Sequence, residues 1–238
     1  MEENTALADQ ARAFASTLQD TIRRVLPSEA VIGARFTPSA NALLVTPLSG
    51  SSVAEIPLTV GGEPVAFWSF SFQMTLDSSG AFLKTVKSAF ALRSTFEDIP
   101  LARLEYDGNM RTAPVSHWQF HGERGAFSHL LARAHAMKKY VTDRPHSLSS
   151  VHFPTGGERF RPGMEDFLEF LVRECGVDRV DGWQRAIEEG REIWRRFQMR
   201  TVTRDLQAEA AQTLRDLNWT VTPPADFEES VGRAIKRW

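Results

Sequence analysis

The hydrophobic periodicity of the chain changes twice along its length. Apolar residues recur near the helical period from residue 5 to residue 26, which predicts an amphipathic helix that ends before Pro27. From residue 31 to residue 121, short apolar runs alternate with polar positions and are separated by turn sequences, which is typical of strands. The helical period then returns over most of the remaining chain.

The middle region predicts an antiparallel sheet. Its candidate strands are residues 31–36, 42–46, 53–59, 64–76, 81–94, 101–107 and 117–121. A helix is the alternative over 81–94, but the turn at residues 77–80, with Gly80 at its end, favours a return strand. Strands that follow one another through short turns imply a meander.

The C-terminal region predicts helices with one apolar face each. They cover residues 125–141, 164–175 and 182–199, with a further helix from Thr203 to about residue 218 and a short strand at 150–153. We therefore predict an α+β fold, in which an antiparallel β-meander carries an N-terminal helix and a C-terminal helical extension. Residues 1–162 would form the sheet domain and residues 163–238 the extension. Because apolar helix faces need a partner surface, we expect the extension to pack on the sheet as one cooperative unit.

Composition narrows the class of protein. The net charge of −2 excludes a globally basic nucleic-acid binder, and the single cysteine, Cys175, excludes an intramolecular disulfide and fits a reducing compartment. The acidic first four residues are followed by no apolar signal region, and no apolar run approaches the ~20 residues of a membrane span. We therefore expect a cytoplasmic protein without membrane contact. The excess of arginine over lysine indicates a GC-rich, bacterial genome.

All six histidines lie in one stretch of the chain, at positions 117, 121, 129, 135, 146 and 152. Between residues 111 and 161, eight basic residues stand against three acidic ones, so this segment carries +5 and the rest of the chain −7. A cationic, histidine-rich segment on an acidic body suggests an anionic partner, either RNA or a phosphorylated small molecule.

The spacing of these histidines favours acid–base chemistry over a metal site. His117 and His121 lie on a predicted strand, where residues four apart are about 13 Å from each other, too far to share one ion. No cysteine pair, HExxH motif or carboxylate set accompanies them, so we predict no metal and no cofactor.

Histidine titrates near neutral pH and is suited to general acid–base catalysis. The candidate catalytic residues are the histidines on predicted strands: His117, His121 and His152. The candidate anion-binding residues are those of the following glycine turn: Gly156, Gly157, Arg159 and Arg161. Together they would suit a metal-independent nuclease or a phosphodiesterase-like hydrolase. The alternative is structural: a strand histidine is often only solvated or hydrogen-bonded, and paired glycines often form only a hairpin turn.

The order of residues 104–107 (LEYD), Pro114, His117, His121 and residues 152–154 (HFP) resembles the histidine-bearing strands of TumE-like toxins of bacterial toxin–antitoxin pairs. The resemblance covers about residues 64 to 172. It implies a toxin-like or defence-associated role directed at RNA or a nucleotide.

Two functions of different classes fit these residues. The first is a toxin-like enzyme that acts on RNA or a phosphorylated small molecule through its histidines. The second is a non-catalytic protein-interaction module, such as an antitoxin, an immunity protein or a complex subunit. In the 182–199 helix, arginines at 185, 191, 195 and 196 are interleaved with glutamates, which predicts a solvated, ion-paired face.

Overall fold

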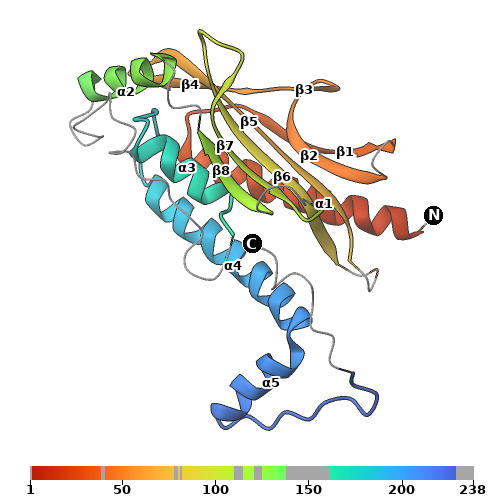
Figure 1. Cartoon of the computed structure of the whole chain (residues 1–238). Coiled ribbons are helices and arrows are strands. Elements are labelled where there is room, and N and C mark those ends of the chain that lie inside the picture. Colours follow the sequence, from red (N-terminus) through yellow and green to blue (C-terminus); the bar gives the residue numbers. More distant parts are fainter. Residues whose placement is uncertain are drawn as a thin grey trace.

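The computed structural model of the chain describes residues 2–38, 41–77, 80, 82–109, 115–120, 125–137 and 161–228. These residues form an eight-stranded antiparallel sheet, with helices at both ends of the sequence (Figure 1). The predicted α+β class is therefore confirmed. Within the described part of the chain, no helix is both long enough and apolar enough to cross a membrane.

The described elements follow one another as one helix, then eight strands, then four helices. The strands are β1 (Val31–Thr37), β2 (Ala42–Ser49), β3 (Ser52–Val53), β4 (Ile56–Val60), β5 (Glu63–Leu76), β6 (Leu83–Ser94), β7 (Pro100–Asp107) and β8 (Ser116–Phe120). The helices are α1 (Glu2–Val25), α2 (Gly125–Met137), α3 (Met164–Arg173), α4 (Trp183–Asp205) and α5 (Gln207–Asp216).

The strand order is β1-β2-β5-β6-β7-β8, so the main path of the sheet is the expected meander. The predicted strand 53–59 is wrong as a single element. It is divided into β3, which pairs with β2, and β4, which pairs with β5, because the chain must cross from one neighbour to the other. β5 and β6 form the long central hairpin, which pairs from Ala66 with Ser94 to Leu76 with Leu83.

The core lies between one face of this sheet and the helices. Alternation along β5 directs Trp68, Phe70 and Phe72 to this face, which we call the helix-covered face. Phe167 of α3 stacks on the ring of Trp68, with 6.0 Å between the ring centroids. Phe14 of α1 contacts the ring of Phe72 edge to face. Aromatic contacts therefore join the first and third helices to the same strand.

The helical extension divides into a packed part and a projecting part. The first half of α4 packs on α1 and α3 and buries Trp183, Ala186 and Ile187. The second half of α4 reaches the turn between β5 and β6, where Arg204 contacts Phe82, and α5 lies beyond it with no buried residue (Figure 1). The residues after 228 lie outside the described part.

Two predicted helix boundaries in this region are wrong. α4 runs without interruption to Asp205, so no new helix begins at Thr203. The break comes at Leu206, where the backbone leaves the helical region at φ −131° and ψ 57°. The predicted helix 125–141 is described only as far as Met137, and the predicted strand 150–153 lies outside the described residues.

Candidate functional site

His117 lies on β8, the edge strand of the sheet, directly opposite Glu105 of β7. Its Nε2 atom is 3.6 Å from Oε2 of Glu105. Arg103 approaches the same carboxylate, with 3.4 Å between Nη1 and Oε1, and donates a hydrogen bond to Gln119. These four side chains form a polar cluster on the face of the sheet opposite the helix-covered face.

The cluster can hold an imidazole in a fixed orientation. A carboxylate next to a ring nitrogen sets which nitrogen carries the proton, as the orienting acid of a catalytic pair does. In this arrangement Glu105 also has a cation on its other side, in Arg103. The geometry therefore suits either a general base or a simple cross-strand ion pair.

Arg161 lies at the start of the helical extension and is held between two aromatic rings. Its guanidinium carbon is 4.3 Å from the ring centroid of Tyr106 and 4.8 Å from that of Trp194. Its carbonyl oxygen accepts a hydrogen bond from Gln198 of α4. Burial lowers the pKa of the Arg161 guanidinium, since the two rings exclude water from a cation. Arg161 thus ties the end of β7 to α4.

The sheet separates Arg161 from His117. Glu105 and Tyr106 are consecutive on β7, so their side chains point to opposite faces. His117 contacts Glu105, whereas Arg161 stacks on Tyr106. The structure therefore does not bring these two predicted site residues together, and they cannot contact one small substrate at the same time.

The other predicted site residues cannot be assigned a position in this arrangement. His121, His152, Gly156, Gly157 and Arg159 lie outside the described residues. Among the residues that are described, no group of three or more histidine, cysteine, aspartate or glutamate side chains is arranged to hold a metal ion.

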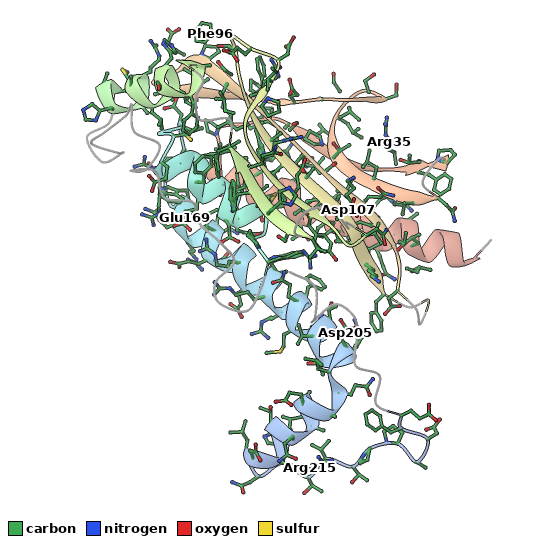
Figure 2. The ribbon with its side chains drawn as sticks, viewed as in Figure 1. Arg35, Phe96, Asp107, Glu169, Asp205 and Arg215 are labelled. Atoms are coloured by element: carbon green, nitrogen blue, oxygen red, sulfur yellow. The ribbon has the colours of Figure 1, made fainter. Side chains whose placement is uncertain are left out.

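A buried polar network between α3 and α4 was not predicted from the sequence. Asp166 accepts a hydrogen bond from the N–H of Gly163 at 2.8 Å and caps α3. Arg191 of α4 donates to Asp166 and to Glu169, and the ion pair with Glu169 is 2.5 Å long (Figure 2 labels Glu169). Although burial alone raises the pKa of Glu169, hydrogen bonds from Arg191 and Arg173 lower it overall. The prediction of a fully solvated arginine face on this helix is therefore wrong for Arg191.

Glu165 is buried beside this network but forms no ion pair within the described part of the chain. Its carboxyl group lies between two glycines. A Cβ added to Gly163 would be 2.8 Å from Oε2, and one added to Gly190 would be 2.8 Å from Oε1. Burial raises the pKa of Glu165 to about 7. The one sequence signal was Gly190 itself, because glycine inside a helix costs about 1 kcal/mol and needs a reason.

The projecting part of the extension carries an exposed apolar surface. We call residues 193–219 the arm. Six of its large apolar side chains are between 40% and 65% exposed: Ile193, Phe197, Met199, Val202, Leu217 and Trp219. Figure 2 shows Arg215 on α5, away from the body of the molecule, and Asp205 at the end of α4, where the neighbouring Arg204 contacts Phe82. An open hollow of about 630 Å³ lies along α4, and Arg195, Arg196 and Met199 of the arm form part of its lining.

Comparisons with known proteins add no relative to this geometry. No protein-family model matches the chain, and neither does any curated protein or solved structure. The resemblance of residues 64–172 to TumE-like toxins therefore stays a prediction.

Proposed function

We propose that this protein is a non-catalytic protein-interaction module that binds its partner through the arm. The observation that carries the proposal is the exposure of six large apolar side chains on residues 193–219. Single exposed apolar residues are ordinary, but six within one short segment are typical of a binding surface.

The charge of the arm indicates the chemistry of the partner. Residues 193–206 contain four arginines and one aspartate. On the same segment Met199 and Val202 are three residues apart and lie on one face of α4. A basic helix with an apolar stripe fits an apolar groove with acidic walls. The partner is therefore a protein with such a groove, since phosphates alone would leave the apolar side chains in water.

Contacts with the sheet hold α4 in place before any partner binds. The guanidinium carbon of Arg204 lies 3.8 Å from the centroid of the Phe82 ring, at the turn between β5 and β6. Gln198 and Trp194 also contact the body through the carbonyl of Arg161. A helix that is already ordered loses less conformational entropy on binding, which raises affinity.

The proposal is tested by capture of proteins from extracts of the source cells with three forms of the full chain. The first is the unchanged protein, and the second carries Met199→Ser, Val202→Ser and Leu217→Ser. The third is a control with Val53→Ser and Ile99→Ser, whose residues are similarly exposed but lie on β3 and in the turn before β7, outside the arm. A stoichiometric partner that is retained by the first and third and lost by the second supports the proposal. A partner that all three forms bind equally would contradict the proposal. So would RNA that the second form, with its three serine substitutions, still binds as well as the unchanged protein does.

A second candidate function is toxin-like acid–base chemistry on RNA or a phosphorylated small molecule. The contact between His117 and Glu105 favours it, because a carboxylate that orients an imidazole is the usual support of a general base. Expression of the His117→Gln protein in a bacterial host provides the test. Growth inhibition and RNA cleavage that disappear with this change, at unchanged thermal stability, support the function. The absence of both from the unchanged protein would contradict it.

A further inference from the structure

β1 forms the free margin of the sheet at the end opposite β8 (Figure 1). Two hydrogen bonds identify which of its backbone groups point outward. The N–H of Ile32 donates to Oε1 of Gln19 at 2.9 Å, outside the sheet. Opposite Ile32, the carbonyl of Pro47 on β2 accepts from Ala54 at 2.9 Å, on the side away from β1. Ile32 and Pro47 are therefore a non-hydrogen-bonded pair of the ladder.

Backbone N–H and C=O groups alternate in direction along a strand, which fixes the direction of these groups in the other residues of β1. Because the backbone N–H and C=O groups of Ile32 point away from β2, those of Ala34 and Phe36 also point away from it. In the described part of the chain, only Ile32 of these three has a protein acceptor for its outward N–H. Val31 and Phe36 are 54% and 49% exposed. β1 is thus a free edge with apolar side chains, which is the kind of edge that pairs with another strand.

We propose that a second copy of this chain pairs with β1 across this edge, antiparallel and around a twofold axis at Ala34. Ala34 then lies opposite Ala34 of the second copy, and Ile32 lies opposite Phe36 of the second copy. The outward N–H and C=O groups of these residues become the hydrogen-bonding pairs of a new ladder. The Ile32 N–H exchanges the side-chain oxygen of Gln19 for a carbonyl of the second copy.

Side chains select this register over its neighbours. In the proposed pairing Phe36 faces a β-branched residue, Ile32, which is a favourable cross-strand pair. Arg35 faces Gly33 of the second copy, so no charge opposes it. A shift of the axis by one residue would place Arg35 opposite Arg35, and like charges directly opposite are destabilising. An axis at Gly33 would oppose Arg35 to Val31 and lose the pair between Phe36 and Ile32, so the side chains of β1 favour the axis at Ala34.

Pairing of two copies would join both sheets into one and leave each arm free. The β1 edge and the arm lie on different elements, and neither surface includes residues of the other. The dimer therefore stands apart from the proposed function of the arm, and failure of one proposal leaves the other intact.

The mass of the full chain in solution, measured by sedimentation over a wide range of protein concentration, provides the first test. We expect a monomer–dimer equilibrium for the unchanged protein. Ala34→Pro should abolish the dimer, because it removes an outward N–H without breaking the ladder to β2. Phe36→Lys should do the same, whereas Ile99→Lys, at a similarly exposed apolar position in the turn before β7, should not. A protein that stays monomeric throughout, or a dimer that survives both β1 changes, would overturn the proposal.

Cross-linking tests the register separately from folding. Opposite residues of a hydrogen-bonded pair have Cα atoms about 5.5 Å apart, within the range for a disulfide. Ala34→Cys should therefore form a disulfide between two copies under mild oxidation. Arg35→Cys should not, since its copies would be diagonal neighbours about 7–8 Å apart. The native cysteine, Cys175, is fully buried and will not interfere. Cross-linking through position 35 in place of position 34 would refute the twofold axis at Ala34.

Discussion

The carboxyl group of Glu165 occupies the space that a side chain on Gly190 would need. An ideal Cβ on Gly190 would lie 2.8 Å from Oε1 of Glu165 and 3.0 Å from its Cγ. The contact joins α3 to the middle of α4, so this pair fixes how closely the two helices approach.

Replacement of Gly190 by alanine should destabilise the protein. Alanine favours a helix over glycine by about 1 kcal/mol, but overpacking of a well-packed interior costs about 1–3 kcal/mol. We expect a net loss in the free energy of unfolding, measured with a chemical denaturant. Gly125→Ala, at the start of α2, is the control, because nothing lies within 4 Å of its added Cβ.

The loss of stability caused by Gly190→Ala should depend on the length of the side chain at position 165. Glu165→Ala removes the atoms that the new Cβ would meet, so Gly190→Ala should cost less in that background than in the unchanged protein. A double-mutant cycle measures this coupling. Strictly additive effects would mean that the two positions are not in contact.

The stability of the protein should depend on pH through Glu165. Burial raises the pKa of this carboxyl from 4.5 to about 7, so between these values the folded state binds a proton that the unfolded state has lost. The contribution of Glu165 to the free energy of unfolding is therefore fully present below pH 4.5, and it is lost as the pH rises to about 7. The loss amounts to about 3 kcal/mol, at 1.36 kcal/mol for each pKa unit.

Glu165→Gln should remove this dependence, because an amide does not titrate. Above pH 7 the variant should be more stable than the unchanged protein, and below pH 4.5 the two should be similar. Unfolding curves recorded across this range check the prediction. Glu169 titrates below its ordinary pKa and is present in both proteins, so it does not affect the comparison. Equal slopes for both proteins would refute the assignment to Glu165.

Arg161 should stabilise the protein through its stacked rings more than through its charge. Cation–π contacts contribute about 0.5–2 kcal/mol each, and Arg161 contacts both Tyr106 and Trp194. We expect Arg161→Ala to lower the free energy of unfolding by about 1–3 kcal/mol, and Arg161→Lys to restore only part of it, since an ammonium has no flat surface to stack. Full stability of the lysine variant would show that charge alone is sufficient.

Asp178 should couple the helical extension to the sheet. It accepts hydrogen bonds from the hydroxyl of Thr59 at 2.7 Å and from the N–H groups of Gly61 and Gly62 at 3.0 and 2.8 Å. Bonds to a charged acceptor contribute about 1.5–3 kcal/mol each. Asp178→Ala should therefore lower the thermal midpoint of the whole protein in one transition. A second, separate transition would mean that the extension unfolds independently of the sheet.

The strands and the first helix could be predicted because their periodicity is local. Trp68, Phe70 and Phe72 alternate with polar residues, and that alternation alone assigns them to one face. The division of residues 53–59 into two strands could not be predicted, because it depends on which neighbour each half meets. The break at Leu206 could not be predicted either, since neither proline nor glycine occurs between Gly190 and Pro223.

The candidate site was harder to predict than the fold. His117 and Arg161 lie on opposite faces of the sheet. Their positions depend on the register of β7 with β8 and on a contact of Arg161 with Trp194, which is 33 residues away in the sequence. Glu165 and Asp166 both look like ordinary acidic residues of a first helical turn. Only the packing of α4 places Arg191 within hydrogen-bond distance of Asp166 and Gly190 against the carboxyl group of Glu165.

The fit of Glu165 between two glycines also constrains how the sequence can diverge. Among homologues that keep this helix crossing, a side chain at position 190 is compatible only with a shorter residue at position 165, and one at position 163 also needs a smaller residue at position 194. These positions should therefore change jointly during evolution, like other residues in direct contact. Such correlated variation would identify distant members of the same lineage even where the remaining sequence has lost all detectable likeness.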